Sequence, residues 1–363
     1  MLSLRLLVTC LLVSVAVSLP AKDKKPAAPA EAEAKSLFNG KNLDGWVNVN
    51  CHPDTFFVKG DEIITTGTPT GFLRTDKQYE NFELDFDWMH VEKVKMANSG
   101  LFVWGDPLPG VGTPYTRGIE VQVLINFAPK DGWATSHGDI FSIHGARCTP
   151  DRPHPTRKGM ERCLPSEERV KGGGEWNHYK VIANDGAIKL HVNGKEVSGV
   201  SKSNPRKGYL ALESEGVECH FKNIKIKELP STNPKPEEIA QEASGYVSIF
   251  NGVDLKGWTA KEGEWKVAGG VLKAAGKTDL AREKMLPNGG VIQFDWKVPA
   301  KSTAGLSLDA SGTALAFKAE KPGLWQRSKV VLTPKAGGTT VAFKSVDGLE
   351  VMNVFALDLP EKK

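Results

Sequence analysis

Residues Phe82–Trp88 read FELDFDW, and in this stretch apolar residues alternate strictly with acidic ones. In an extended chain, this period of two puts the aromatic and leucine side chains on one face and the three acidic side chains on the other. Such a stretch predicts a half-buried β-strand, with its apolar face toward a core and its acidic face toward water.

Two further stretches have the same period and are followed by turn residues. Residues 119–123 read IEVQV, and residues 188–192 read IKLHV and lead directly into Asn193-Gly194. Asn-Gly is typical of a two-residue hairpin turn, because both turn positions need a positive φ. Many short alternating stretches with Gly and Asn turns, and almost no helical period, predict an all-β protein built as a β-sandwich.

The chain also contains an internal repeat. Residues 36–46 read SLFNGKNLDGW and residues 248–258 read SIFNGVDLKGW, so both share the pattern F-N-G-x-x-L-x-G-W in register. Further matching stretches follow in the same order: 56–63 with 265–272, 82–88 with 292–296, 99–101 with 304–306, and 176–182 with 325–331. The repeat predicts two copies of one sandwich.

The two copies differ in size. The first has a long central segment between Trp104 and Trp176, whereas the second has a short one between Leu308 and Trp325. We therefore predict a full sandwich followed by a shortened, non-catalytic copy that keeps the frame. The predicted boundaries are 36–229 for the first sandwich, 230–247 for a polar, proline-bearing linker, and 248–359 for the second sandwich.

Composition excludes several classes of protein. The chain has 363 residues, of which 40% are hydrophobic and 25% charged, so it can bury a core and wholesale disorder is excluded. The formal net charge of +4 is too even for a protein that binds nucleic acid through phosphate contacts. We therefore expect no nucleic-acid partner.

The first residues predict export. Residues 1–18 hold one arginine, followed by an apolar stretch that is shorter than the roughly 20 residues needed to span a membrane. They have the layout of a signal peptide that ends in small residues. Residues 19–35 are rich in Pro, Ala and charge, which predicts a disordered tether. We expect a secreted or periplasmic protein without a membrane span.

Four cysteines remain after the signal peptide: Cys51, Cys148, Cys163 and Cys219. An even number in an exported protein predicts disulfides, and four cysteines allow three pairings. Cys148 and Cys163 flank one loop, so we favour that pair, and Cys51–Cys219 would follow by elimination. Buried free thiols are the alternative. The sequence has no CxxC pair, which argues against a zinc site.

Candidate residues for chemistry lie in the segment that only the first copy has. In residues 117–124, RGIEVQVL, the period of two puts Glu120 and Gln122 on one face. A carboxylate and an amide side by side are suited to hold sugar hydroxyls or a metal ion. The plain alternative is the solvent-facing side of a strand. Arg117, which precedes this pair, is a candidate for binding an oxyanion.

Residues 137–144, HGDIFSIH, supply two candidate bases, His137 and His144. Imidazole exchanges protons near neutral pH. Asp139 lies between them and, with Glu120, is a candidate ligand for a divalent metal ion, the one cofactor that the sequence suggests. The spacing fits no established metal motif, and a structural hydrogen bond from each histidine is the alternative.

Four more residues are candidates for binding a sugar. Residues 210–216, LALESEG, offer two glutamates, of which we select Glu213, with surface ion pairing as the alternative. Arg74, Asn98 and Trp104 come at predicted strand ends, where an arginine can bind an oxyanion and a tryptophan can stack on a sugar ring. Core packing is the commoner role of a tryptophan.

Seven motifs follow one another in the first copy: F-N-G-K-x-L-x-G-W, G-F-L-R-T, N-S-G-L-F, G-x-E-V-Q-V-L, G-E-W-N-x-Y, V-N-G-K and F-x-N-I-x-I-K-E-L. Together they resemble the 3-keto-disaccharide hydrolase domain family over residues Ser36–Leu229. The resemblance implies a concanavalin A-like jelly-roll sandwich, a carbohydrate partner oxidised at sugar C3, and often export. The family's E-V-Q corresponds to Glu120-Val121-Gln122, and the Asp that usually follows is Ile125 here.

The implied reaction explains these residue types. A ketone at C3 acidifies the proton on C2; a base removes this proton, the enolate expels the group on C1, and water adds back. We expect His144 or His137 to act as the base and Glu120 with Gln122 to bind a metal ion or hydroxyls. Arg74 or Arg117 would bind the oxyanion.

Two other functions are compatible with the sequence. One is a non-catalytic, lectin-like carbohydrate-binding protein, since a fold does not fix a function. The other is an ordinary retaining glucanase. The E-x-D-x-E strand of jelly-roll glucanases would read Glu120-x-Gln122-x-Leu124 here, so two of the three acids are absent. We therefore favour a hydrolase or lyase that acts on 3-keto-glycosides.

Overall fold

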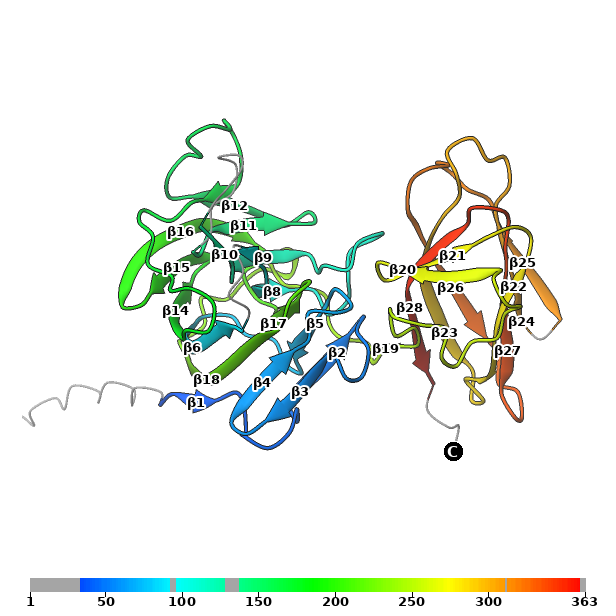
Figure 1. Ribbon diagram of the computed structural model, residues 1–363, viewed down its shortest axis with the longest axis horizontal. Coiled ribbons are helices and arrows are strands. Elements are labelled where there is room, and N and C mark those ends of the chain that lie inside the picture. The colour runs from blue at the N-terminus through cyan, green and yellow to red at the C-terminus, as the bar shows by residue number, and fades with distance from the viewer. Residues whose placement is uncertain (1–32, 92–95, 128–136, 311, 360–363) are drawn as a thin grey trace, which may run out of the picture. The chain divides into compact units, whose positions relative to one another are not determined.

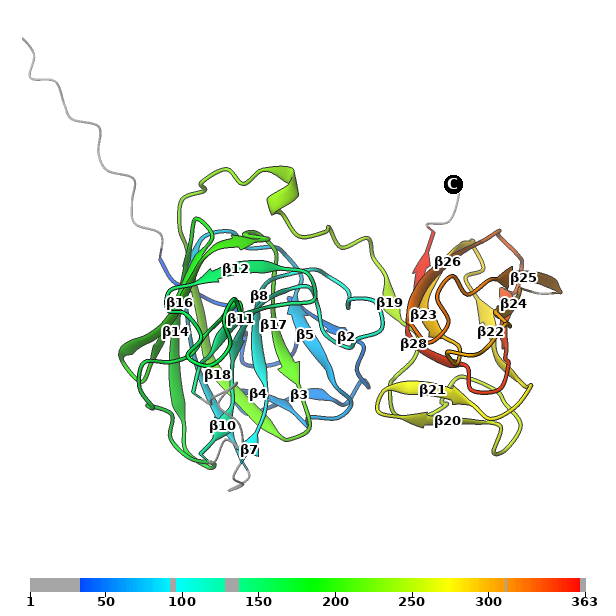
Figure 2. The same cartoon turned by 90° about the horizontal axis from the view of Figure 1, so that it is seen from above.

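The computed structural model describes residues 33–91, 96–127, 137–310 and 312–359. This part of the chain consists of strands β1 to β28 and one turn of 3-10 helix, η1 (Pro236–Glu238), and it contains no α-helix. The strands form a jelly-roll sandwich and a second, reduced sandwich, drawn in blue to green and in yellow to red in Figures 1 and 2. The predicted all-β class is confirmed. The predicted signal peptide, residues 1–18, lies outside the described residues.

The larger sheet of the first sandwich has the strand order β12-β16-β15-β14-β6-β18-β4-β3, with β1 added beside β18. Its strands are β1 (Lys35–Ser36), β3 (Phe56–Lys59), β4 (Glu62–Thr65), β6 (Phe82–His90), β12 (Arg147–Pro150), β14 (Asn177–Asn184), β15 (Ala187–Val192), β16 (Lys195–Asn204) and β18 (Cys219–Glu228). Asn193 and Gly194, with φ of 47° and 89°, form the predicted hairpin turn between β15 and β16.

The smaller sheet of the first sandwich has the strand order β13-β11-β9-β8-β17-β5-β2. Its strands are β2 (Trp46–Val49), β5 (Gly71–Thr75), β8 (Gly100–Gly105), β9 (Gly118–Gln122), β11 (Ile140–Ile143), β13 (Arg162–Cys163) and β17 (Tyr209–Ser214). A separate short pair joins β7 (Met96–Ala97) to β10 (Ile125–Asn126).

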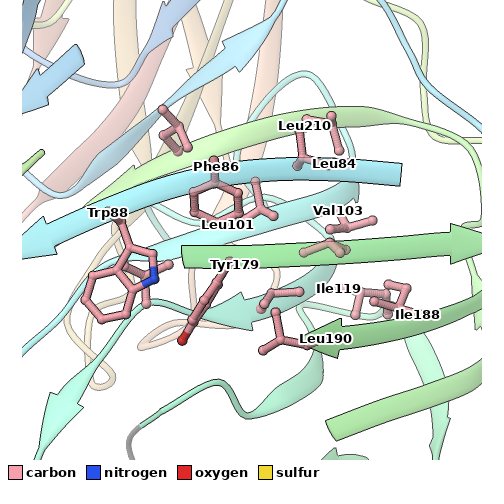
Figure 3. Close-up of a cluster of buried hydrophobic side chains, with 14 of the residues drawn as sticks. Leu84, Phe86, Trp88, Leu101, Val103, Ile119, Tyr179, Ile188, Leu190 and Leu210 are labelled. Carbon is pink, nitrogen blue, oxygen red and sulfur yellow. The ribbon is translucent and has the colours of Figure 1, made fainter. Parts of the chain in front are cut away.

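The core of the first sandwich lies between these two sheets (Figure 3). In β6 every second side chain is buried, as the alternation of FELDFDW predicts. The rings of Phe86 and Trp88 meet Tyr179 of β14 edge-on, with centroids 5.6 and 5.3 Å apart. Leu101 of β8 and Ile119 of β9 enter the same core from the smaller sheet. Burial of such side chains is the main stabilising contribution to the sandwich.

The smaller sheet differs from the larger one because its outer face is buried as well. In β6 the outward residues are partly exposed, whereas all five residues of β9 are buried, and the same holds for every residue of β8 and β17. The polar side chains Glu120, Gln122 and Glu213 therefore lie on a sheet face that other parts of the chain cover.

The second sandwich also consists of two sheets, with the strand orders β20-β21-β28-β23-β26 and β22-β27-β24-β25, and β19 pairs with β28. Its strands are β19 (Val247–Ser248), β20 (Trp265–Ala268), β21 (Val271–Ala274), β22 (Asp279–Met285), β23 (Gly290–Lys297), β24 (Leu306–Ala310), β25 (Thr313–Phe317), β26 (Gln326–Leu332), β27 (Thr339–Lys344) and β28 (Glu350–Asp358). Phe294, Phe343 and Trp258 are among the aromatic residues that fill its core.

The two sandwiches share one topology. The order β3-β4-β18-β6-β14 corresponds to β20-β21-β28-β23-β26, and β5-β17-β8-β9 corresponds to β22-β27-β24-β25. In the described residues the second sandwich has no counterparts of β2, β11, β12, β13, β15 and β16. It is therefore a reduced copy of the first.

The repeated opening motif forms the same turn in both sandwiches. Asn39 Oδ1 accepts hydrogen bonds from the backbone N–H groups of residues 41 and 42 at 2.8 and 3.0 Å. Asn251 Oδ1 does the same for residues 253 and 254 at 2.9 and 3.0 Å. The indole N–H of Trp46 donates to Leu37 O at 2.9 Å, and that of Trp258 donates to the equivalent carbonyl at 3.1 Å. The motif F-N-G-x-x-L-x-G-W is thus conserved between the copies for local structure.

The predicted disulfides are wrong, since all four cysteines are free and buried. Each Sγ atom lies 3.7–3.9 Å from a backbone carbonyl oxygen: Cys51 from Pro69, Cys148 from Glu161, Cys163 from Leu164 and Cys219 from His220. The four thiols fill the core as small apolar groups, a role that an even count of cysteines does not distinguish from pairing. In the described residues no helix is long and apolar enough to cross a membrane.

Candidate functional site

The outer face of the smaller sheet carries two carboxyl groups above a glycine. β8 lies between β9 and β17, so Gly100 of β8 has Glu120 on one side and Glu213 on the other. A methyl group at Gly100 would lie 3.0 Å from Glu120 Oε1 and 2.9 Å from Glu213 Oε2. Because glycine has no side chain, the two carboxyl groups lean over Gly100 from neighbouring strands and share one small space.

A chain of hydrogen bonds joins the polar side chains next to this pair. Gln122 Nε2 donates to Asn98 Oδ1 at 2.7 Å, and Asn98 Nδ2 donates to Glu215 Oε2. The hydroxyl of Tyr115 donates to the other Glu215 oxygen at 2.7 Å. Arg162 Nη2 donates to Gln122 Oε1 at 3.0 Å. We name the convergent set the acidic cluster: Asn98, Glu120, Gln122, Glu213 and Glu215.

Burial raises the pKa values of both carboxyl groups above Gly100. The pKa of Glu120 is raised to about 8, first by burial and then by the charge of Glu215, while Arg162 acts in the opposite direction. The pKa of Glu213 is raised well above its usual range by burial and by the charges of Glu120 and Glu215. Two buried carboxyl groups in one space resist joint ionisation, so the pair holds at least one proton at neutral pH.

Glu213 is the group best placed to hold that proton. Its side chain is 1% exposed, no N–H group of the described residues donates to either carboxyl oxygen, and its hydrogen-bonding neighbour is another acid, Glu215. A buried anion without donors costs several kcal/mol, on the order of the desolvation penalty, so the neutral acid is favoured. A protonated Glu213 is a hydrogen-bond donor, and the carboxyl group of Glu215 lies within its reach.

Asp139, the predicted metal ligand beside Glu120, is neutralised by an arginine. Arg162 Nε donates to Asp139 Oδ2 at 2.6 Å, and both side chains are buried. Among the described residues, no group of three or more His, Cys, Asp or Glu side chains is arranged to hold a metal ion. The residues present therefore do not fit the predicted divalent cation.

The two candidate bases have different surroundings. The ring of His144 stacks on Tyr115, with centroids 5.6 Å apart, and its Nε2 lies 3.2 Å from Thr113 Oγ1. His144 therefore meets the acidic cluster through Tyr115. His137 is fully buried, and its Nε2 lies 3.8 Å from Glu168 Oε1. Burial lowers the pKa of both imidazoles, so both are neutral at pH 7.

Both arginines predicted to bind an oxyanion lie at the base of the long hairpin between β8 and β9, residues 106–117. Arg117 is the last residue of this hairpin, and Arg74 contacts it from β5. Arg117 donates two hydrogen bonds to the carboxylate of Asp106, at 2.8 and 3.1 Å. The buried Arg74 donates from Nε to Pro107 O at 3.2 Å and from Nη1 to Thr75 O at 2.8 Å. In these positions both guanidinium groups hold the base of the 106–117 hairpin.

Trp104, predicted to stack on a sugar ring, is a core residue. Its side chain is 0% exposed, and its indole N–H donates to Glu80 O at 2.8 Å. This prediction is wrong, because a ring without an exposed face cannot stack on a sugar. Strict alternation along β8 would put Trp104 on the outer face of the sheet. The pairing of β8 with β17 shifts register here, and Trp104 has a φ of 56°, so the alternation is broken and the ring lies in the core.

Four other residues of the site have weak or no signals in the sequence. Glu215 follows Glu213 by two positions, so the alternation that selects one also selects the other. Gly100 lies in the N-S-G-L-F motif, which gives no hint that its missing side chain makes room for two carboxyl groups. Tyr115 and Arg162 come from segments without a period, and only the structure places them in the site.

No curated protein matches the chain. Among solved structures, a candidate glycosyl hydrolase from Parabacteroides distasonis is 22% identical, covers 54% of this chain and 94% of its own, and has a TM-score of 0.41. A carbohydrate-binding module from Bacillus subtilis is 12% identical, with coverages of 51% and 96% and a TM-score of 0.36. A β-glucanase from Bacillus licheniformis is 13% identical, with coverages of 56% and 100% and a TM-score of 0.34.

The comparison with protein families is more specific. The model of the 3-keto-alpha-glucoside-1,2-lyase-like domain matches residues 33–227. This range contains the first sandwich up to the penultimate residue of β18 and every residue of the acidic cluster, and it confirms the resemblance drawn from the seven motifs. The chain therefore belongs to the family of 3-keto-alpha-glucoside-1,2-lyase-like domains.

Proposed function

We propose that the acidic cluster cleaves 3-keto-glycosides, by removing the proton on C2 and expelling the group on C1. The observation that carries the proposal is the pair of buried carboxyl groups, Glu120 and Glu213, that meet above Gly100 with raised pKa values. Membership of the family supports a carbohydrate-active, glycosyl hydrolase-like protein. The pair supplies the two groups that the reaction needs, a base and a hydrogen-bond donor.

Glu120 is the base in this proposal. A ketone at C3 acidifies the C2 proton, and Glu120, with its pKa raised to about 8, is a stronger base than an ordinary carboxylate. Its ionised carboxylate accepts the proton, the electrons of the C2–H bond form a C2–C3 double bond, and the π electrons of the C3 carbonyl move to its oxygen, which gives an enolate. Glu213, kept protonated by burial, donates a hydrogen bond to that oxygen.

The second half of the reaction breaks the glycosidic bond. The enolate electrons return to form a C1–C2 double bond, the C3 carbonyl is restored, and the C1–O bond breaks. The leaving oxygen takes up the proton that Glu120 accepted. Water then adds its oxygen to C1 and a proton to C2, so the net change is hydrolysis. In this proposal the amide groups of Asn98 and Gln122, which hydrogen-bond to each other beside Glu215, bind sugar hydroxyls.

Position favours Glu120 over the histidines as the base. Glu120 lies directly beside Glu213, so base and donor face one space. His144 reaches this space only through the ring of Tyr115, and the buried His137 lies next to Glu168. Abstraction of a proton needs the base within hydrogen-bond reach of it, which only Glu120 combines with a neighbouring donor.

The test is cleavage of a 3-keto-glucoside by the purified full chain, beside the unoxidised glucoside. Glu120→Gln should lower kcat/KM by roughly 100-fold or more, the usual contribution of a general base. Glu83→Gln is the matched control, because Glu83 is a surface carboxylate of β6 that pairs with Lys180. In D₂O, the wild type should place deuterium at C2 of the sugar, and Glu120→Gln should not.

The pH profile is a second readout of the same experiment. Only the ionised form of Glu120 accepts a proton, so kcat/KM should rise with pH through about 8, where its pKa lies. The competing function is carbohydrate binding without catalysis. It is supported if the wild type binds the sugar, leaves it uncleaved and incorporates no deuterium at C2.

A further inference from the structure

The tip of the 106–117 hairpin contacts side chains of the second sandwich. Asn353 of β28 donates from Nδ2 to the carbonyl oxygens of Gly110 and Thr113, at 3.2 and 2.9 Å. Arg327 of β26 donates from Nη2 to Pro109 O at 2.9 Å. These contacts are to backbone atoms, so they fix the path of the tip.

Asp295 of β23 completes this contact and joins the three side chains. The backbone N–H of Gly112 donates to Asp295 Oδ2 at 2.9 Å. Arg327 donates to both oxygens of Asp295, at 2.7 and 3.0 Å, and Asn353 donates to Oδ2 at 2.7 Å. Asp295 and Asn353 are 0% exposed, and a buried carboxylate is stable only when it is paired and hydrogen-bonded. We name Asp295, Arg327 and Asn353 the polar trio.

The hairpin tip fits against the second sandwich because residue 112 is glycine. Gly112 has a φ of +70°, and a methyl group there would lie 2.2 Å from Cγ of Trp325. The backbone of the tip therefore lies directly on the indole ring. Any side chain at this position would push the tip away from the polar trio.

The first sandwich has the same three positions without a hairpin tip on them. Asp87, His178 and Asn223 occupy in β6, β14 and β18 the places that the polar trio occupies in β23, β26 and β28. His178 Nδ1 lies 2.8 Å from Asp87 Oδ1, and Asn223 Nδ2 donates to Asp87 Oδ2 at 2.7 Å. The side chain of His178 is 46% exposed. The arrangement is thus common to both copies, and only the second copy buries it under the hairpin.

The hairpin links the polar trio to the acidic cluster. Tyr115 stands on the returning arm, and its backbone oxygen accepts a hydrogen bond from Gly110 N–H at 2.8 Å, which ties the two arms together. From there Tyr115 donates to Glu215 and stacks on His144. A shift of the tip would therefore move the phenol that holds Glu215 in the cluster.

A second contact reaches the same sheet face. Phe355 of β28 belongs to one buried apolar cluster with Phe72 of β5 and Phe102 of β8. In the smaller sheet, Phe72 lies opposite Glu213 and Phe102 lies opposite Glu120. The second sandwich therefore covers the apolar part of the face whose polar part is the acidic cluster.

We propose that the second sandwich is a positioning element for the site of the first. The polar trio fixes the tip of the 106–117 hairpin and thereby sets the place of Tyr115 beside Glu215. The effect on cleavage rests on the proposed function, whereas the contact with the hairpin can be measured without any substrate. Asp295, Arg327 and Asn353 are positioning residues, because they act through the hairpin.

Asn353→Asp tests the proposal in the full chain. The substitution keeps a side chain that tolerates positive φ, removes two hydrogen-bond donors and adds a carboxylate beside Asp295. We expect a fall in kcat/KM of at least about tenfold, carried by kcat, because misplaced catalytic groups lose this much or more. The amide proton of Gly112 should exchange faster with solvent.

The ring of His144 gives a readout that needs no substrate. Burial lowers the pKa of His144, which lies against Thr113 and Tyr115 of the hairpin. In Asn353→Asp its pKa, measured by NMR of labelled histidine, should rise toward the ordinary value as the hairpin moves off. Asn223→Asp makes the same change in the exposed counterpart of the polar trio and should leave every readout as in the wild type.

Gly112→Ala is the second variant, and it serves if Asn353→Asp fails to fold. Its control is Gly60→Ala, because Gly60 has a similar φ of +63° and nothing within 4 Å of an added methyl group.

The proposal is overturned if Gly112→Ala and Asn353→Asp leave both kcat/KM and the pKa of His144 at wild-type values. It is also overturned if the hairpin loosens while kcat/KM is unchanged. If the wild type cleaves no 3-keto-glycoside, the proposed function fails, and the His144 titration still decides whether the polar trio positions the hairpin.

Discussion

At the scale of single residues, the site depends on a position without a side chain. Gly100 separates Glu120 from Glu213, and its bare backbone allows the two carboxyl groups to approach each other. Their raised pKa values follow from that approach and from burial. The residue that brings acid and base together therefore carries no functional group of its own.

Gly100→Ala should disable the pair and leave the fold in place. The added methyl group would lie 2.9 and 3.0 Å from the two carboxyl groups, which must then turn apart. We expect kcat/KM for a 3-keto-glucoside to fall at least about tenfold, as for other small displacements of catalytic groups. Gly172→Ala is the control, since its methyl group would meet Glu175 at an ordinary 3.8 Å. Equal kinetics for the two variants would contradict this account of the site.

Part of the acidic cluster could be predicted from the sequence. Glu120 and Gln122 were predictable because alternation alone shows that they share a face. Tyr115 was not, because it comes from an irregular hairpin and meets Glu215 across 100 residues of sequence. Trp104 was assigned wrongly, because a sequence does not distinguish a tryptophan that stacks on a ligand from one that packs in a core.

At the scale of elements, the 106–117 hairpin connects most of the parts described above. Arg74 and Arg117 hold its base, and Tyr115 brings it to the acidic cluster. The strands themselves were predictable, as the alternation in β6 and the Asn193-Gly194 turn show. The burial of the outer face of β9 was not, because alternation in β9 does not distinguish a covered polar face from one open to water.

Arg74→Met separates two roles of one arginine. As an anchor of the hairpin, Arg74 satisfies the buried carbonyl oxygens of Pro107 and Thr75, and its loss should lower the free energy of unfolding by about 1–3 kcal/mol. As a group that binds the substrate oxyanion, it would instead lower kcat without a change in stability, because the negative charge develops in the transition state. Urea unfolding and substrate kinetics on the same variant decide between the two.

The control for this prediction is Arg147→Met. The side chain of Arg147 is 76% exposed and pairs with Glu161 at the surface, where an ion pair contributes about 0–1 kcal/mol. If Arg74→Met unfolds at the same urea concentration as this control while its kcat falls, Arg74 stabilises the oxyanion and the hairpin has another anchor.

At the scale of the whole molecule, the repeat was visible in the sequence but the use of its second copy was not. The matched strands recur in the same spatial order in both sandwiches. Asp295, Arg327 and Asn353 look like ordinary outward polar residues of alternating strands. Their partner, the tip at residues 109–113, is about half the chain away in sequence, and no local pattern connects the two.

The four buried thiols give a prediction about the molecule as a whole. Because Cys51, Cys148, Cys163 and Cys219 are unpaired, no disulfide between them stabilises the first sandwich, and a reducing agent should leave Tm unchanged. A native disulfide contributes about 2–4 kcal/mol, so its reduction would lower Tm by several degrees.

Alkylation without a reducing agent checks this at the level of each cysteine. Iodoacetamide should label none of the four positions in the folded protein, where burial also raises the pKa of Cys51, Cys148 and Cys219 and suppresses the reactive thiolate. It should label all four after unfolding, as read by peptide mass. A position that is labelled only after reduction would show that its thiol is paired. Since each of these thiols lies inside the core, their free state is expected even if the protein folds in an oxidising compartment.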